Sequence, residues 1–250
     1  MSSNTKDISS GWEALLKWDP NAKRIEIQTD GVANDVWLVE INGQRAIARL
    51  GKRSDADLDW ETKLLTFLGA NGIRVPAPIP NLDGELFANG LVVMEYLEGT
   101  KPETEADWRR VAETLKKVHA LTRNWPQRPG WKSSADLITE TTGTKVDLTQ
   151  MPTDGVARCR NAWRKLSGTP QSVIHGDPNA GNILMTKDSV GLTDWDEAHF
   201  DYCALDLPLP HNAADLPRDE LAIIKQASAA WEAAVCWGDD YAKRRLAEVI

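Results

Sequence analysis

Residues 172–196 read SVIHGDPNAGNILMTKDSVGLTDWD, and this stretch decides how the rest of the chain is interpreted. The apolar pair at 173–174 predicts a short strand that leads into His-Gly-Asp at 175–177. Two more short strands are predicted at 183–185 and 190–193, with a turn through Lys-Asp-Ser between them. The segment therefore presents one Asp, one Asn and a second Asp from irregular backbone flanked by strands.

Three polar side chains of this segment, Asp177, Asn182 and Asp194, have the types and the order that phosphoryl transfer needs. A carboxylate must orient the attacking hydroxyl and accept its proton, while an amide oxygen and a second carboxylate hold the magnesium ion that neutralises the phosphates. The alternative is a hairpin whose Asp and Asn side chains serve only turns, as these residues often do. The combination of HGDxxxxN, a short hairpin and DW favours phosphoryl transfer.

The run from His175 to Asn182, followed by Asp194 and Trp195, resembles the aminoglycoside phosphotransferase and choline kinase-like family. These are small-molecule relatives of protein kinases, whose catalytic loop has the form H-R-D-x-x-x-x-N followed by D-F-G. The resemblance implies that Asp177 is the catalytic base and that Asn182 and Asp194 are magnesium ligands.

The same resemblance implies an α+β, two-lobed protein-kinase-like fold. A small N-terminal antiparallel β-sheet lobe with one helix precedes a larger, mostly helical C-terminal lobe. We expect the nucleotide-binding lobe at 1–97 and the catalytic and substrate-binding lobe at 98–250. The resemblance extends over roughly 24–237 and is weakest at 123–152, a stretch expected to belong to a substrate-binding insertion because long loops are often functional.

Composition excludes several classes of protein. The 250 residues are 42% hydrophobic and 26% charged, as in ordinary globular proteins, and the net charge of -8 argues against nucleic acid or an anionic membrane as partner. The three cysteines have no metal-binding spacing, and no apolar run approaches the ~18 residues that span a bilayer. Without a signal-like start, the chain is expected to be cytoplasmic.

A short helix is predicted at 11–18. Strands are predicted at 24–28, 35–41 and 45–50, the last two joined by Asn-Gly, a strong hairpin signal. The loop between the first two strands resembles the family's G-x-x-N nucleotide-covering loop through Gly31 and Asn34. Taken alone, that loop is equally well an ordinary turn.

Arg49 in the third strand occupies the position of the protein-kinase lysine, where this family often has arginine. A guanidinium can bind phosphate oxygens through two parallel hydrogen bonds, although an exposed strand arginine is the plainer alternative. A helix predicted at 55–70 supplies Glu61 as the residue that would orient Arg49, with Asp57 one turn away as the competing choice.

A hairpin is predicted to turn at Asp83–Gly84. The apolar run at 91–97 then predicts a buried strand that continues into the hinge of the family fold. The resemblance implies that Met94 lies behind the nucleotide base, and that the Glu95 carbonyl and the Leu97 amide pair with the edge of the base. Helices are predicted beyond the hinge at 104–121, 155–166, 217–237 and 239–249, and Asp206 is expected to cap or brace a helix start.

We therefore expect an ATP-dependent, or GTP-dependent, phosphotransferase that uses Mg²⁺ and phosphorylates a hydroxyl of a small, amino-bearing molecule. An aminoglycoside-type antibiotic is the first choice of acceptor, and a housekeeping metabolite such as an aminosugar or choline is the alternative. A catalytically inactive kinase-fold binding protein is the third hypothesis. The sequence has no GxxxxGK[ST] motif, which excludes a P-loop enzyme.

Overall fold

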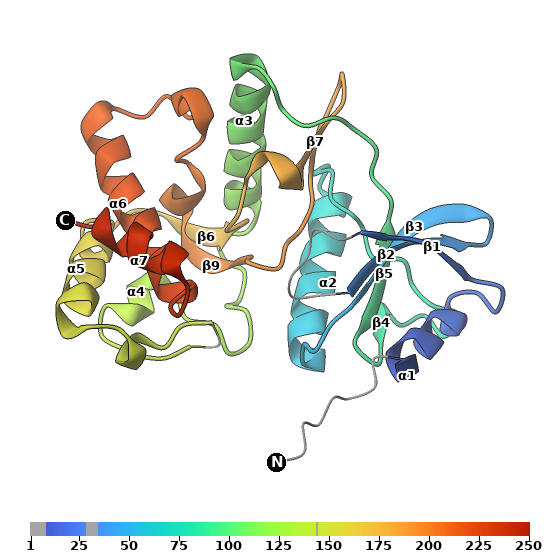
Figure 1. Ribbon diagram of the computed structural model, residues 1–250. Coiled ribbons are helices and arrows are strands. Elements are labelled where there is room, and N and C mark those ends of the chain that lie inside the picture. Colours follow the sequence, from blue (N-terminus) through green and yellow to red (C-terminus); the bar gives the residue numbers. More distant parts are fainter. Residues whose placement is uncertain (1–8, 29–34, 144) are drawn as a thin grey trace, which may run out of the picture. The chain divides into compact units, whose positions relative to one another are not determined.

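The computed structural model describes residues 9–28, 35–143 and 145–250. The chain forms two compact units, an N-terminal unit (Met1–Gly99) and a C-terminal unit (Thr100–Ile250). The first is dominated by a sheet and the second by helices (Figure 1). The α+β class expected from the sequence is confirmed.

The sheet of the N-terminal unit has five antiparallel strands in the part of the chain that the structure describes, in the order β1-β2-β3-β5-β4. The β2–β3 hairpin turns at Asn42 and Gly43, whose φ values of 48° and 75° are those that a two-residue turn of this kind requires. The strands are β1 (Lys23–Gln28), β2 (Asp35–Ile41), β3 (Gln44–Leu50), β4 (Phe87–Ala88) and β5 (Leu91–Glu95).

Helix α2 (Asp55–Ala70) follows β3 and has the predicted bounds. Ser54 caps its first turn by accepting a hydrogen bond from the backbone N–H of Asp57. The helix buries a row of leucines, and Gly72 follows it with φ 79°. A single helix was expected at 11–18, but the chain forms α1 (Ser9–Trp12) and a 3₁₀ turn, η1 (Glu13–Lys17).

The expectation of a hairpin turning at Asp83–Gly84 is wrong. Asn81 closes a local turn there, since its backbone oxygen accepts the N–H of Gly84 and its side-chain oxygen accepts those of Asp83 and Glu85. The β4–β5 hairpin turns instead at Asn89–Gly90, where both φ values are positive. An Asn side chain that satisfies backbone groups locally competes with strand pairing.

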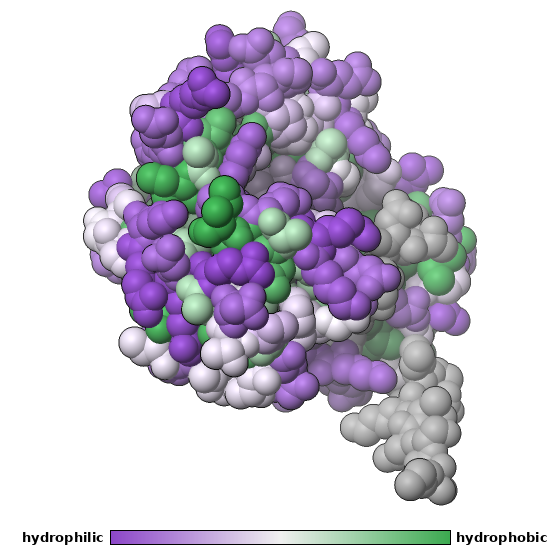
Figure 2. All heavy atoms as spheres, turned by 60° about the vertical axis from the view of Figure 1, so that its left-hand side comes forward, coloured by the Kyte–Doolittle hydropathy of each residue, from purple (hydrophilic) through white to green (hydrophobic). Residues whose placement is uncertain are grey.

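The C-terminal unit packs its helices around a core centred on Trp163, which is fully buried and donates its indole N–H to the carbonyl of Ala227. Figure 2 presents a face of this unit that is mostly hydrophilic, with apolar side chains gathered in small areas. The helices are α3 (Glu105–Leu121), α4 (Ser134–Leu137), α5 (Thr153–Arg164), α6 (Arg218–Val235) and α7 (Asp240–Ala247).

Two short antiparallel ladders frame the sequence motif. Strand β6 (Gln171–Ile174) pairs with β9 (His199–Tyr202), and β7 (Ile183–Met185) pairs with β8 (Val190–Leu192). The loops that leave β6 and β8 carry the motif residues. Among the described residues, none of the helices combines the length and apolar character needed to cross a bilayer.

Helix α3 begins with a capping box that can be tested directly. Thr104 Oγ1 accepts the N–H of Asp107, and the Asp107 carboxylate accepts the N–H of Thr104. Thr104→Ala should lower the free energy of unfolding by about 1 kcal/mol, measured by urea denaturation, because it leaves a helix N–H without its cap. Thr104→Ser is the matched control and should retain most of the stability; equal losses in both variants would contradict the capping role.

Candidate active site

The loop after β6 begins with a sharp turn. Gly176 has φ 86°, and a Cβ placed on it would lie 2.5 Å from the carbonyl oxygen of Glu197, so only glycine fits. A 3₁₀ turn, η3 (Ala180–Asn182), follows, and Asn179 caps it by accepting the N–H of Gly181 at 2.6 Å. The loop is thus held by its own turn residues on one side and by close packing on the other.

Asp177 and Asn182 lie in direct contact. The side-chain nitrogen of Asn182 is 3.1 Å from Asp177 Oδ2 and 3.0 Å from the backbone oxygen of Asp177. Asn179 donates to the same Oδ2 at 2.8 Å. Two amides therefore fix the rotamer of the exposed Asp177 carboxylate, and the amide oxygen of Asn182 is directed away from Asp177.

Asp194 follows β8 in left-handed backbone, with φ 57°. The preceding residue, Thr193, donates both its N–H (2.9 Å) and its hydroxyl (3.1 Å) to the backbone oxygen of Asn182. His175 Nε2 lies 2.9 Å from the Thr193 oxygen. These contacts connect the Asp194 loop to the Asp177–Asn182 loop, so the structure brings the three predicted residues into one region of the C-terminal unit.

The donor set fits a hard, hydrated cation. No cluster of three His, Cys, Asp or Glu side chains suited to a metal occurs in residues 9–28, 35–143 and 145–250. Asn182 and Asp194 offer one amide oxygen and one carboxylate. Such a sparse oxygen set is typical of Mg²⁺, which keeps several waters and completes its shell with substrate phosphates.

A fully buried carboxylate, Asp206, supports the loop that carries Asp177. It accepts the backbone N–H groups of His175 (2.8 Å) and Gly176 (3.0 Å), and it lies 2.8 Å from the ring nitrogen Nε2 of His119 in α3. Burial raises the pKa of Asp206, but the hydrogen bond and charge of His119, the charge of His175 and the Gly176 N–H outweigh burial and lower the pKa below its usual value.

In the N-terminal unit, Arg49 on β3 pairs with Glu61 on α2. One nitrogen of Arg49, Nη2, lies 2.7 Å from each carboxylate oxygen of Glu61, and both side chains are buried. Asp57, the competing candidate, pairs with Arg53 at 3.0 Å instead. Arg53 also contacts Glu61, so one buried carboxylate holds two guanidinium groups.

The remaining predicted nucleotide contacts lie along and beyond β5. Met94 is buried in the strand, where it pairs with Ile47, while Glu95 ends the strand and the partly buried Leu97 follows it. Gly31 and Asn34 lie outside the described residues.

Sequence reasoning missed three residues that shape these loops. Arg53 follows the predicted strand arginine in a plain loop, and Arg128 sits in a stretch without periodicity. Asp206 was expected to cap or brace a helix start, but it binds the backbone N–H groups of His175 and Gly176 instead. The local signal that the sequence offered lies within the motif, where Asn179 follows Asp177 by two positions and donates to its carboxylate.

The two units have the α+β organisation expected from the sequence, and hydrogen bonds join the Asp177 and Asp194 loops in the C-terminal unit. Residues 24–246 match the phosphotransferase enzyme family, so the chain belongs to that family. A homoserine kinase from Sinorhizobium fredii is 30% identical over 210 residues, which cover 74% of this chain and 61% of that kinase. The chain thus spans less than two thirds of the length of this relative.

Solved structures share the fold at low sequence identity. An aminopropanol kinase associated with a microcompartment has a TM-score of 0.64 and 16% identity, covering 97% of this chain and 94% of that one. A thermostable mutant of the aminoglycoside phosphotransferase APH(4)-Ia, in ternary complex with AMP-PNP and hygromycin B, has a TM-score of 0.67 and 13% identity, covering 96% of each chain. The predicted protein-kinase-like fold is confirmed.

The ionised form of Asp206 should contribute to stability. Asp206→Asn should lower the free energy of unfolding by roughly 3–5 kcal/mol at pH 7, because His119 and two backbone N–H groups lose a buried anion. A carboxyl whose folded pKa is lowered stabilises above its unfolded pKa, about 3.9, and loses that contribution as pH falls through the folded value. The difference from wild type should hold from pH 7 to pH 5 and narrow below about pH 4 in urea titrations.

Asp188→Asn, in the exposed β7–β8 turn, is the control and should change the free energy of unfolding by less than about 0.5 kcal/mol. A gap between wild type and Asp206→Asn that widens on acidification would contradict the role given to the Asp206 anion.

Two glycines with the same backbone conformation separate strain from crowding. Gly168 and Gly176 both have φ 86°, but a Cβ on Gly168 meets nothing within 4 Å. Gly168→Ala should therefore cost only the left-handed penalty of about 1–2 kcal/mol. Gly176→Ala should cost clearly more in urea denaturation, because its Cβ meets the backbone of Glu197; equal costs would contradict the close packing.

Proposed function

We propose that the chain is a small-molecule kinase that transfers the γ-phosphoryl group of ATP, or GTP, to a hydroxyl of a small amino-bearing acceptor. The observation that carries the proposal is the joined pair of loops in which Asp177 contacts Asn182 and Thr193 ties Asp194 to the same residue. Membership of the phosphotransferase enzyme family supports it.

Asp177 is the proposed catalytic base. Its carboxylate orients the acceptor hydroxyl and takes its proton late, because the transition state is loose and needs little base strength. The amide groups of Asn179 and Asn182 hold the carboxylate in one rotamer before the acceptor arrives. Positioning of this kind supplies a large part of the rate in reactions whose chemistry is simple.

Asn182 and Asp194 are the proposed ligands of Mg²⁺. The bound ion would neutralise charge on the phosphates. The contact of the Asn182 side-chain nitrogen with Asp177 directs the amide oxygen away from the base, as a ligand requires. The hydrogen bond from the Thr193 N–H to the Asn182 carbonyl holds the two proposed ligands, Asn182 and Asp194, close to each other in space.

The N-terminal unit is the proposed nucleotide-binding part. Arg49 would bind phosphate oxygens of the nucleotide, and Glu61 would hold its guanidinium in direction. Met94, the Glu95 carbonyl and the Leu97 amide would contact the base, and Gly31 and Asn34 would cover the phosphates. The C-terminal unit would carry the base, the metal ligands and the acceptor site.

The acceptor is proposed to carry an amine. The backbone of Glu197 passes next to Gly176, the residue before the base, and its carboxylate pairs with Lys145 at 2.9 Å on a partly exposed surface. A Glu and a Lys side by side suit an acceptor with both an ammonium and a carboxylate group. Homoserine has both groups and a hydroxyl, and the similarity to a homoserine kinase supports trying it as acceptor before an aminoglycoside-type antibiotic.

Substitution of the motif residues tests the proposal. Asp177→Asn should lower kcat by about 10²–10⁴-fold while the Kd of Mg-ATP, measured by calorimetry, changes less than about threefold, because the base acts on the acceptor. Asp194→Ala should weaken nucleotide binding only when a divalent cation is present, because it removes a ligand. Asp188→Asn, in the same segment, is the control and should leave both quantities unchanged.

Turnover is followed as ADP release with homoserine, 3-aminopropan-1-ol, choline and an aminoglycoside, each with ATP and with GTP. Equal turnover by wild type and Asp177→Asn would remove the base assignment. Absence of any Mg-nucleotide binding by the wild-type protein would favour an inactive kinase-fold binding protein.

A further inference from the structure

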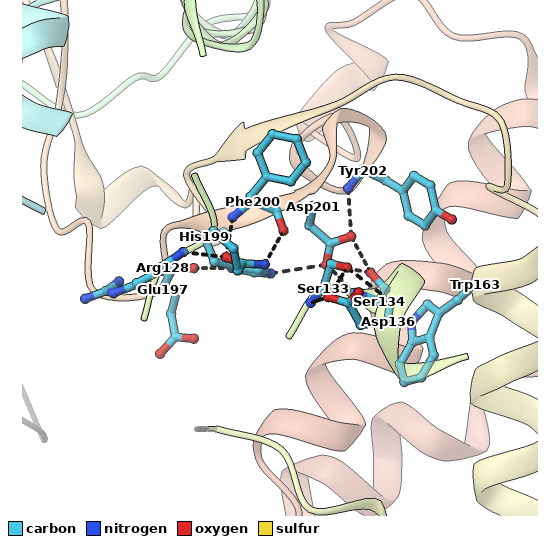
Figure 3. A network of polar contacts seen from close by, with 12 residues as sticks. Arg128, Ser133, Ser134, Asp136, Trp163, Glu197, His199, Phe200, Asp201 and Tyr202 are labelled. Atoms are coloured by element: carbon cyan, nitrogen blue, oxygen red, sulfur yellow. Dashed lines mark hydrogen bonds and ion pairs between the residues drawn. The ribbon is translucent and has the colours of Figure 1, made fainter. Parts of the chain in front are cut away.

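A short stretch of the long loop, residues 127–134, contacts residues 195–201 through Gln127, Arg128, Trp131 and Ser134 (Figure 3). The second stretch begins directly after Asp194. The first stretch is far away in sequence and belongs to none of the motif elements. We call residues 127–134 the bracket.

Arg128 is the centre of the bracket. Its side chain is buried, and its Nη1 donates to the backbone oxygens of Trp195 (3.2 Å), Asp196 (2.8 Å) and Ala198 (2.8 Å). The guanidinium lies 5.0 Å from the centroid of the Trp131 ring. A buried charge is tolerated only where it is hydrogen-bonded, and here the acceptors are three carbonyls of a single turn.

Two other residues of the bracket, Gln127 and Ser134, hydrogen-bond to the residues that follow this turn. Gln127 pairs with both backbone groups of Phe200, donating to its oxygen at 2.8 Å and accepting its N–H at 3.0 Å. Ser134 donates its N–H and its hydroxyl to the buried carboxylate of Asp201. Figure 3 shows the Asp201 carboxylate turned towards Ser134 and the Glu197 carboxylate pointing away from the network.

Aromatic stacking completes the bracket. The His199 ring lies between Trp131 and Trp231, with centroid distances of 4.9 Å and 4.5 Å and nearly parallel planes. The His199 Nδ1 is 2.7 Å from the backbone oxygen of Glu197, and its Nε2 is 3.2 Å from the Asp201 carboxylate oxygen Oδ2. The ring is fully buried, so side-chain contacts fix the segment on both sides of Ala198.

The turn that Arg128 holds bears on Asp194 because the two are continuous. Asp194 has left-handed backbone at φ 57°, a conformation that costs about 1–2 kcal/mol for a residue with a side chain and persists only where the surroundings enforce it. Thr193 is fixed on one side by Asn182, and the three carbonyls bound to Arg128 fix the other side. Asp194 is thus held from both ends.

We propose that Arg128 is a positioning residue: by binding the carbonyls of residues 195, 196 and 198 it keeps Asp194 in the conformation that receives the metal–nucleotide. The inference rests on the proposed function, and it gives the bracket a task distinct from contact with the acceptor. In this role Arg128 acts through the backbone of the Asp194 loop.

Arg128→Met tests the inference, because Met is similarly long but donates no hydrogen bond. Arg128→Lys keeps the charge and some donors, and serves if Met prevents folding. Arg160→Met is the matched control, since Arg160 also holds two backbone oxygens, those of Leu137 (3.1 Å) and Glu140 (2.8 Å), in a segment without proposed ligands. The melting temperature of each variant reports how much stability the substitution removes.

Two measurements report the proposed role without turnover. Hydrogen exchange of the peptide covering 194–200 should be faster in Arg128→Met than in wild type, and unchanged in Arg160→Met. Calorimetric titration of Mn²⁺ into protein with AMP-PNP should give an affinity about 10–100-fold weaker in Arg128→Met, the effect typical of removing a residue that orients a metal ligand. Arg128→Lys should fall between wild type and Met.

Mn²⁺ affinity equal in wild type and the folded Arg128 variants would overturn the inference and leave the proposed function standing. A loss equal in Arg128→Met and Arg160→Met, in proportion to their melting points, would also overturn it, because it would reflect stability alone. No Mn²⁺–AMP-PNP binding by wild type would remove the proposed function and the inference together.

Discussion

The loop that carries Asp177 depends on one buried anion. Asp206 has no solvent exposure, yet it binds the two backbone N–H groups that precede Asp177 and the ring of His119. It therefore joins helix α3, the end of strand β6 and the segment after β9 at a single carboxylate. Without it, the turn at Gly176 would bury unpaired N–H groups, which cost about 1–3 kcal/mol each. The position of Asp177 is thus decided by a residue about thirty positions further along the chain.

The two motif loops are held by opposite chemistry. A carboxylate, Asp206, binds N–H groups at the Asp177 loop, and a guanidinium, Arg128, binds C=O groups at the Asp194 loop. Irregular backbone must find partners for both kinds of group when it is buried, because no ladder or helix supplies them. The bonds from Thr193 to the Asn182 oxygen then join the loops to each other. Polar side chains from distant segments therefore do for these loops what regular hydrogen bonding does for strands.

The sequence predicted the features that depend on residues close together along the chain, and it missed those that depend on distant residues. Helix α2 was predicted at its bounds because a leucine face and an Asn-Gly end are local signals, and the β2–β3 hairpin because Asn42-Gly43 fits one turn type. The motif loop was visible because its residues lie within about twenty positions. Arg128 was not, since an arginine that binds carbonyls some seventy residues away leaves no periodicity. The prediction of a hairpin at Asp83–Gly84 was wrong because the side chain of Asn81 closes a local turn there.

The buried charges of the N-terminal unit position side chains more than they stabilise the fold. Glu61 is 1% exposed and contacts both Arg49 and Arg53, and Asp57 balances the second arginine. Removing such charges from water costs about what their attraction returns, so a buried ion pair contributes little net stability. Its effect is on position: both oxygens of Glu61 lie 2.7 Å from the Arg49 nitrogen Nη2, which anchors that end of the guanidinium on β3. Such an anchor would serve the phosphate-binding role proposed for Arg49, because a guanidinium that is already held loses less freedom when it forms further hydrogen bonds.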